Sequence, residues 1–126
     1  MLEVAAAIIE NKEGEILIAR RREGKSQAGF WEFPGGKLEP GETPEVCLKR
    51  ELKEEMQIEI EPYAYFGINE HQYETVTIRL IAYKAHLLGG TIQLVDHDDV
   101  RWVRPQDLGL FRFAPADVPF VQMLMD

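Results

Sequence analysis

The sequence predicts an α/β (α+β) fold in which a mixed β-sheet is sandwiched between helices. Short apolar runs bounded by turn residues recur along the chain, favour strands and outnumber the helical segments. Two segments with helical apolar spacing lie far apart, which favours helices on opposite sides of a sheet. The chain has 126 residues, a length that fits one domain, so we expect a single domain over residues 1–126.

The first quarter of the chain predicts three strands. Residues 4–9 form an apolar run rich in alanine and β-branched side chains, which is typical of a buried strand. Residues 11–14 have turn composition and residues 16–19 are apolar again, so we expect the second run to complete a hairpin. Residues 20–29 are polar with glycine and serine and predict a loop. Residues 31–33 predict a brief strand that ends at a Pro-Gly-Gly sequence.

Residues 43–56 give the strongest helix prediction. Thr43 suits the N-cap, Pro44 suits the first helical position, and Glu45 favours the positive end of the helix dipole. Apolar side chains that recur every fourth residue form the expected core stripe, namely Leu48, Leu52 and Met56. We therefore expect one face of this helix to pack against the sheet.

The second half of the chain predicts further strands and a closing helix. The expected strands cover residues 58–67, 75–87, 91–95 and 100–103. We place a turn at Gly89 and Gly90. Residues 117–125 predict the closing helix, because Val118, Val121 and Leu124 fall on one face.

Composition excludes several classes of partner. A formal net charge of -8 argues against binding a nucleic-acid polymer, because that binding needs a basic surface. No apolar run approaches the roughly 20 residues needed to cross a bilayer, so no membrane partner is expected. The only cysteine, Cys47, permits no internal disulfide, and we expect a cytoplasmic protein that is a monomer or homodimer.

An acidic cluster on the predicted helix indicates a metal site. Glu51, Glu54 and Glu55 occur at i, i+3 and i+4, so they share one flank of the helix. Like charges this close repel one another unless a cation neutralises them, and Mg²⁺ prefers oxygen ligands. Arg50, four residues before Glu54, can hold that carboxylate in place. The alternative interpretation is a solvated acidic face without any ligand.

The pattern around these glutamates resembles the Nudix box. Gly36 is followed after five residues by Glu42, and after seven more by a run from Arg50 to Ile58 that reads RELKEEMQI. Every specified position matches except Gln57, which stands where the family has a glycine that ends the helix in a left-handed conformation. The sequences WEFPGGK and GETPE further resemble the branch of MutT and CTP pyrophosphohydrolases, and the resemblance covers nearly the whole chain.

The resemblance implies a set of metal-binding and catalytic residues. The side chains of Glu51, Glu54 and Glu55 and the Gly36 carbonyl correspond to metal ligands, with Mg²⁺ as the cofactor and Mn²⁺ as the alternative. Asp96, six residues before a tryptophan, matches a further catalytic and metal-binding acid, or else is one acid of a polar turn. Glu51 is our choice for the general base, with Glu54 and Asp96 as alternatives.

The resemblance also implies a small-molecule nucleotide substrate. Arg21 and Lys37 match positions that contact phosphates, although a solvated basic loop would also explain Arg21. Phe33 and Tyr73 match aromatics near the base, and Phe33 is also a candidate core residue. Asp117 matches the asparagine with which MutT reads oxidised guanine. It can accept from a base amino group, or it can cap the closing helix.

The function that these features favour is magnesium-dependent hydrolysis of a nucleoside triphosphate to the monophosphate and pyrophosphate. The substrate could be canonical, modified or oxidised, as in CTP pyrophosphohydrolases or in sanitisation of the nucleotide pool for DNA repair. One alternative is a Nudix hydrolase of a nucleotide sugar, ADP-ribose or dinucleoside polyphosphate. Another is a non-catalytic nucleotide-binding module, which typically lacks box carboxylates that this chain retains. The base and sugar stay open.

Overall fold

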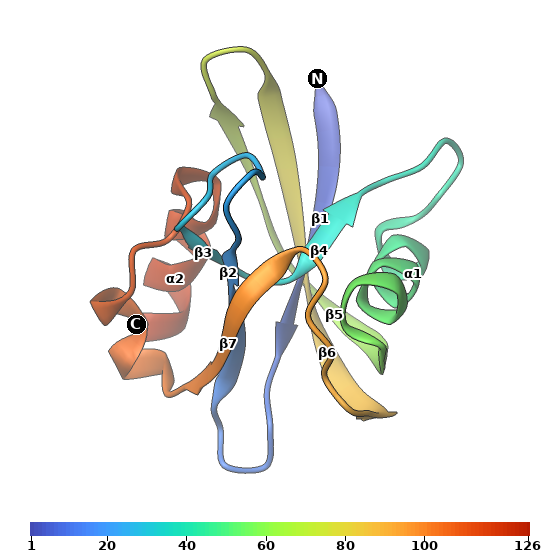
Figure 1. Cartoon of the computed structure of the whole chain (residues 1–126), viewed down its shortest axis with the longest axis vertical. Coiled ribbons are helices and arrows are strands. Elements are labelled where there is room, and N and C mark those ends of the chain that lie inside the picture. Colours follow the sequence, from blue (N-terminus) through green and yellow to red (C-terminus); the bar gives the residue numbers. More distant parts are fainter.

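The computed structural model describes residues 1–126 and has the α/β architecture that the sequence predicts, with mixed β-sheets and helices (Figure 1). The elements in chain order are β1 (Leu2–Ile9), β2 (Ile16–Arg21), β3 (Trp31–Glu32), β4 (Gly35–Lys37), α1 (Pro44–Met56), β5 (Ile58–Gln72), β6 (Thr77–Gly90), β7 (His97–Val103), the 3₁₀ helices η1 (Pro105–Leu110) and η2 (Pro115–Asp117), and α2 (Val118–Met125).

The strands form two sheets and not the single sheet that we expected. One sheet has the order β4-β1-β6-β5, with β1 parallel to β6 and the other pairs antiparallel. The other is antiparallel and has the order β3-β2-β7. The predicted hairpin of β1 and β2 is wrong for the same reason. A turn joins the strands, but beyond one bridge between Glu10 and Ile16 they enter different sheets.

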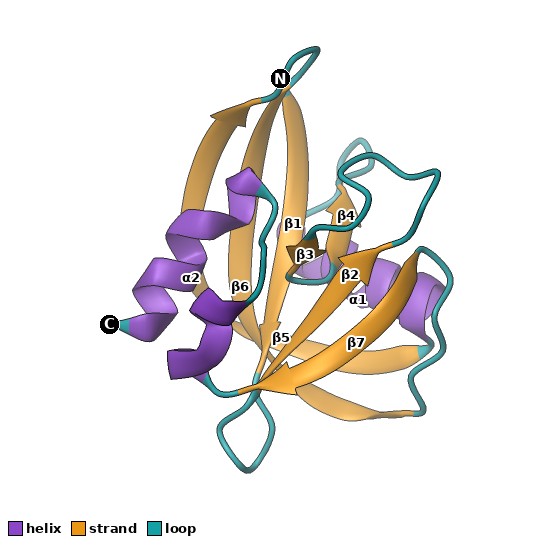
Figure 2. Cartoon of the chain, turned by 60° about the vertical axis from the view of Figure 1, so that its left-hand side comes forward, coloured by secondary structure: helices purple, strands orange, loops and turns teal.

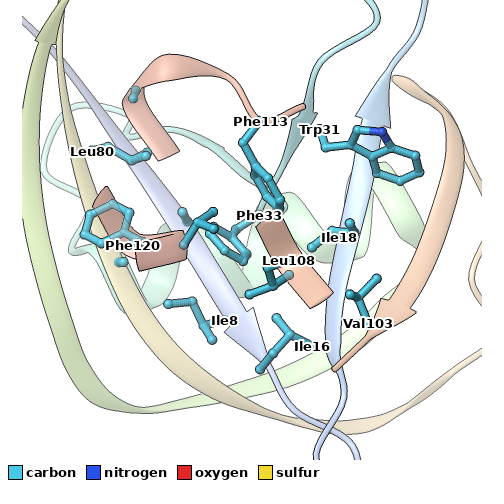
Figure 3. Packing of buried hydrophobic residues seen from close by; sticks show 14 residues of the cluster. Ile8, Ile16, Ile18, Trp31, Phe33, Leu80, Val103, Leu108, Phe113 and Phe120 are labelled. Atoms are coloured by element: carbon cyan, nitrogen blue, oxygen red, sulfur yellow. The ribbon is translucent and has the colours of Figure 1, made fainter. Parts of the chain in front are cut away.

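Alternating residues of β1 and β2 supply two separate cores. Ile8, Ile16 and Ile18 face the first core, together with side chains from η1 and α2 (Figure 3). Their neighbours Ile9 and Leu17 face the second core, which α1 covers. The period of two along a strand sends successive side chains to opposite faces. The helices therefore lie on both sides of the central strands, as the sequence predicts (Figure 2).

Helix α1 begins and ends as the sequence predicts. The Thr43 hydroxyl accepts a hydrogen bond from the Val46 N–H at 3.2 Å, and Pro44 occupies the first turn. The predicted stripe is buried, and full burial of each such side chain stabilises the fold by about 1.5–3 kcal/mol. Gln57 takes the left-handed C-cap conformation, with φ 57°, and its N–H bonds to the Lys53 carbonyl. The helix thus ends as a glycine would end it.

Two predictions between β6 and β7 are wrong. Gly89 and Gly90 do not form a turn but end strand β6, where they pair with the start of β5. Residues 91–95 are not a strand, because the chain leaves the sheet after Gly90. Their link to the neighbouring α1 is one hydrogen bond from the Gln93 N–H to the Met56 carbonyl. Of this segment's apolar side chains, only Ile92 packs against the second core, so the apolar pattern suggested more pairing than the fold provides.

The closing helix starts one residue later than predicted, at Val118, and two 3₁₀ helices precede it. Asp117 occupies the N-cap position, but its side chain makes no capping hydrogen bond. The expected capping role is therefore wrong, and the Asp117 carboxyl instead bonds to strand β3's end, as described below. Neither α1, with 13 residues, nor α2, with 8, is long and apolar enough to cross a membrane.

Candidate active site

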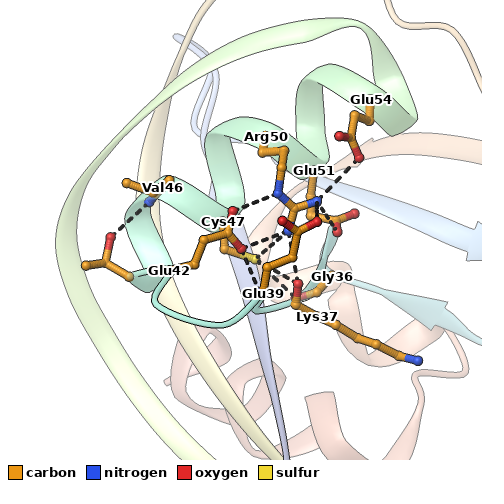
Figure 4. Close-up of polar contacts among 10 residues, drawn as sticks. Gly36, Lys37, Glu39, Glu42, Val46, Cys47, Arg50, Glu51 and Glu54 are labelled. Atoms are coloured by element: carbon orange, nitrogen blue, oxygen red, sulfur yellow. Dashed lines mark hydrogen bonds and ion pairs between the residues drawn. The ribbon is translucent and has the colours of Figure 1, made fainter.

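Gly36 brings strand β4 against the acidic flank of α1. The strand pairs with β1, where Gly36 is opposite Ala5. A Cβ atom on Gly36 would lie only 2.5 Å from the nearer Glu51 carboxylate oxygen and 2.7 Å from the other. Any side chain at this position would displace the carboxylate from where it lies, so the Gly36 backbone and the Glu51 side chain are direct neighbours (Figure 4).

Arg50 holds the acidic residues of this region in place. Its guanidinium donates to both carboxylate oxygens of Glu42, at 2.7 and 2.8 Å, and to Glu51 at 2.9 Å (Figure 4). A bidentate pair of this kind is strong and directional. It lowers the pKa of Glu42 to about 2, the hydrogen bonds from Arg50 being the largest cause. The predicted contact from Arg50 to Glu54 is also present, at 3.3 Å.

Asp96 and Glu55 meet although the loop that carries Asp96 is distant in sequence. The pKa of Glu55 is raised to about 9, first by burial, then by its hydrogen bond with Asp96 and by the charge of Glu51. The pKa of Asp96 is lowered by that hydrogen bond and by Lys25, whose ammonium lies 2.9 Å away. The structure therefore brings Glu51, Glu55 and Asp96 together.

The donors in this cluster are suited to a hard divalent cation. Carboxylate oxygens and the Gly36 carbonyl are the kind of ligand that Mg²⁺ selects. Burial first, and then the neighbouring Asp96 and Glu51, favour a proton on Glu55, and a bound cation would offset the repulsion among these carboxylates. Although Glu51, Glu55 and Asp96 are neighbours, no three acidic, histidine or cysteine side chains are arranged as the ligands of one ion, and the Glu54 side chain is 61% exposed. Binding would therefore require these side chains to rotate inward.

A pocket of about 270 Å³ lies next to this cluster, and every residue that we predicted to bind substrate lines it. Those residues, together with the box glycine, are Arg21, Phe33, Gly36, Lys37, Tyr73 and Asp117. Much of the remaining lining is apolar, from β1 and β6. A partly apolar pocket with a few polar groups is typical of a small-molecule site. Gly36 links it to the carboxylate cluster, because it touches both.

Asp117 is almost completely buried, at 5% exposure. One of its oxygens, Oδ2, accepts a hydrogen bond from the Phe33 N–H at 3.1 Å. Burial raises the pKa of Asp117 well above its ordinary value, and the negative charge of Glu32 raises it further. Burial therefore favours the protonated form of the Asp117 side chain, which can donate one hydrogen bond as well as accept others.

The two predicted aromatic residues have different surroundings. Phe33 is 2% exposed and belongs to the first core, so its role is partly structural. Tyr73 is half-buried, and its hydroxyl accepts a hydrogen bond from the Ala116 N–H at 3.0 Å. Asn69 donates to the carbonyl of the same residue, also at 3.0 Å. The end of β5 thus fixes the backbone of η2 and, through it, Asp117.

Two basic residues line the pocket. Arg21 is tied to Ser26, with its Nε 2.9 Å from the backbone carbonyl, and its Nη1 lies 3.5 Å from Glu32. Lys37 is exposed beside Gly36. Sequence reasoning missed Glu32, which also lines the pocket. Its signal was a single charged residue inside a very short strand, between two large aromatics that the structure buries.

Comparison with known proteins identifies the class. Residues 2–124 match the NUDIX domain model, and the chain belongs to the Nudix hydrolase family. Within that family it falls in the branch of MutT and CTP pyrophosphohydrolases. Its identity to the CTP pyrophosphohydrolase of Escherichia coli strain K12 is 39% over 125 residues, covering 99% of this chain and 92% of that protein.

A second relative is named for a different nucleotide. The 8-oxo-dGTP diphosphatase of Haemophilus influenzae is 36% identical over 126 residues, covering 100% of this chain and 93% of that protein. Among solved structures, the solution structure of the E. coli ORF135 protein superposes with a TM-score of 0.84 at 39% identity. That match covers 99% of this chain and 89% of the other. The chain is therefore a Nudix hydrolase homologous to nucleoside triphosphate diphosphatases.

Proposed function

We propose that this protein hydrolyses a nucleoside triphosphate to the monophosphate and pyrophosphate with the help of Mg²⁺. The observation that carries the proposal is the position of Gly36, which lines the pocket and also abuts the Glu51 carboxylate. A nucleotide whose base lies in the pocket would extend its phosphates past Gly36 toward the acidic cluster. Full-length relatives named for nucleoside triphosphates support the same substrate class.

We assign roles to the polar residues from their contacts and positions. The Glu51 carboxylate is fixed by Arg50 at 2.9 Å, which suits it to take a proton from the attacking water. Glu51, Glu54, Glu55, Asp96 and the Gly36 carbonyl would hold the metal. When bound, Mg²⁺ supplies a Lewis acid that neutralises charge on the phosphates. Arg21 and Lys37 bring positive charge to the same chain of phosphates.

The pocket favours a base with an exocyclic amino group. Glu32 offers a hydrogen-bond acceptor, and the protonated form of Asp117, which burial favours, offers a donor next to an acceptor. Cytosine and purines present amino groups beside ring nitrogen or carbonyl acceptors, whereas uracil and thymine have no amino group. The names of the two relatives, for CTP and for 8-oxo-dGTP, agree with this set of bases.

A nucleotide panel tests the proposal. Purified protein would be incubated with Mg²⁺ and CTP, dCTP, 5-methyl-dCTP, 8-oxo-dGTP, 2-hydroxy-dATP, UTP and ADP-ribose, and the products would be identified by chromatography. We expect monophosphate and pyrophosphate from at least one nucleoside triphosphate that carries an amino group. Hydrolysis of ADP-ribose or nucleotide sugars alone would overturn the substrate class.

Two glutamate variants distinguish the loss of a proposed metal ligand from the loss of a carboxylate outside the site. Glu54→Gln should lower kcat by on the order of 10²-fold or more, because it removes a proposed ligand of the metal. Glu59→Gln removes an exposed carboxylate that pairs only with Lys53, at 3.4 Å, and should leave turnover unchanged. Near-parental turnover by Glu54→Gln would contradict the assignment of Glu54 to the metal.

A further inference from the structure

Three polar side chains lie side by side on the three-stranded sheet. Glu32 comes from β3, Arg21 from β2 and His97 from the start of β7. The register between β2 and β7 shifts between Arg20 and Arg21, so that Arg20 pairs with Asp99 but Arg21 pairs with His97. Such an irregularity re-aims side chains at the edge of a functional site. Here it places His97 opposite Arg21 and within reach of Glu32.

Both contacts to the Glu32 carboxylate fall on one oxygen. The Nε2 atom of His97 lies 2.8 Å from Oε2, and the Nη1 atom of Arg21 lies 3.5 Å from the same atom. The other oxygen, Oε1, has no hydrogen bond within the chain. Glu32 lines the pocket and its side chain is 19% exposed. Oε1 is not among the buried atoms without a partner, so a ligand can reach this oxygen.

The surroundings of His97 fix the proton on its ring. The side chain is fully buried, and its Nδ1 atom has no hydrogen-bond partner. A carboxylate oxygen can only accept, so the Nε2 atom that faces it carries a proton and donates. The Nδ1 atom has no partner within reach and takes no part in holding Glu32. His97 thus serves as a fixed donor to Glu32.

We propose that His97 is a positioning residue for the nucleotide pocket, holding Glu32 so that its free oxygen Oε1 accepts a hydrogen bond from the substrate's amino group. This inference rests on the proposed function, since it concerns how that pocket distinguishes nucleotides. Because His97 follows Asp96 directly, one loop end supplies an acid to the carboxylate cluster and a donor to the pocket. The two halves of the site are joined through two consecutive residues.

Loss of the His97 donor should change which nucleotides the pocket prefers. Without the His97 donor, the Glu32 side chain would lose its shortest contact and be held only by the longer one to Arg21. A substrate donor would then meet a mobile acceptor, which weakens binding of nucleotides that carry the amino group. Nucleotides without that group, such as UTP, would be affected much less.

The test compares His97→Leu with His97→Gln, measuring kcat and KM for CTP and UTP with Mg²⁺ and thermal unfolding of each variant. Leucine removes the donor, whereas the glutamine side chain can place an N–H near the position of Nε2. We expect His97→Leu to raise KM for CTP about ten-fold with kcat within about two-fold, and to reduce the preference for CTP over UTP by a similar factor. Glutamine should restore KM to within about three-fold of the parent.

A second variant keeps the test decisive if His97→Leu does not fold. Glu32→Ala retains His97 and removes the acceptor, so it should cause the same rise in KM and the same loss of preference. Equal losses with glutamine and leucine, or a fall in kcat with preference retained, would overturn the role of His97. Failure of the parent protein to hydrolyse any nucleoside triphosphate would instead overturn the proposed function.

Discussion

At the scale of single residues, Asp117 illustrates how burial changes the chemistry of a side chain. A carboxylate in water is only an acceptor, but this carboxyl is buried beside Glu32 and bonded to the Phe33 N–H. Its raised pKa favours the protonated form, which has a donor beside an acceptor, as an asparagine side chain has. Asp117 is therefore closer to an asparagine, in chemical terms, than its residue type suggests.

The raised pKa of Asp117 predicts a pH dependence of stability. An acid whose pKa is higher in the folded state holds its proton more tightly there, so ionisation favours the unfolded chain. The free energy of unfolding should therefore lose a contribution as pH rises above the ordinary aspartate pKa of 3.8. Asp117→Asn cannot ionise and can still accept from the Phe33 N–H.

The measurement is chemical denaturation of the metal-free protein at several pH values between about 4.5 and 8.5. The stability of Asp117→Asn relative to the parent should increase as pH rises. A control variant at Asp107, in the first turn of η1, should keep the parent's dependence. A constant difference between Asp117→Asn and the parent would mean that Asp117 is already ionised in the folded protein.

Among single residues, the sequence identified some site members better than others. Arg21, Phe33, Lys37, Tyr73 and Asp117 were predicted from a resemblance, and all line one pocket. The partners of these residues could not be predicted, because they are set by long-range contacts. Phe33 and Asp117, for example, are 84 positions apart in the chain.

At the scale of secondary-structure elements, β4 has two adjacent glycines with different neighbours. A Cβ on Gly35 would collide with the backbone carbonyl of Ala5 on β1. A Cβ on Gly36 would collide with the Glu51 side chain, which can move. Alanine in place of Gly35 should therefore lower stability, whereas alanine in place of Gly36 should lower activity.

Gly36→Ala should lower kcat by on the order of 10²-fold while retaining a folded protein, since it displaces the Glu51 carboxylate by an ångström or more. Gly35→Ala should destabilise the protein by about 1–3 kcal/mol, because backbone atoms must shift. Steady-state kinetics and denaturant unfolding on both variants measure these effects. Full activity in Gly36→Ala would show that the close approach of Gly36 to Glu51 has no role in turnover.

The left-handed conformation of Gln57 at the end of α1 predicts that replacing it with glycine stabilises the protein. Gln57 adopts a left-handed conformation that costs a residue with a Cβ about 1 kcal/mol or more, and glycine removes this cost. Gln57→Gly should stabilise the protein by about 0.5–1 kcal/mol after the greater flexibility of glycine in the unfolded chain is included. Gln57→Ala keeps a Cβ and should show no such gain. A lower stability of Gln57→Gly in thermal unfolding would contradict the strain at this position.

The sequence predicted elements with strong local signals and missed those that depend on pairing. The cap, the first-turn proline and the apolar stripe define α1 within its own residues, so its bounds were predicted closely. Whether residues 91–95 form a strand depends on a free partner edge, which no local pattern encodes. The division of β1 and β2 between two sheets has the same origin.

At the scale of the whole molecule, the two cores place the two halves of the site. The core beneath α1 holds the acidic flank against β4, and the core beneath α2 holds η2 and Asp117 against the end of β3. Strands β1 and β2 contribute to both cores, so they form the shared support. The pocket and the carboxylate cluster lie on either side of Gly36 as a result of this arrangement.

In the proposed complex a nucleotide spans from the pocket to a metal held by the helix carboxylates. The most direct test is anomalous diffraction from a crystal grown with Mn²⁺ and a non-hydrolysable nucleoside triphosphate. We expect the manganese signal next to the carboxylates of Glu51 and Glu55 and the Gly36 carbonyl, with the base against Asp117. A metal bound elsewhere while these carboxylates face solvent, or a base outside the pocket, would contradict this mode of binding.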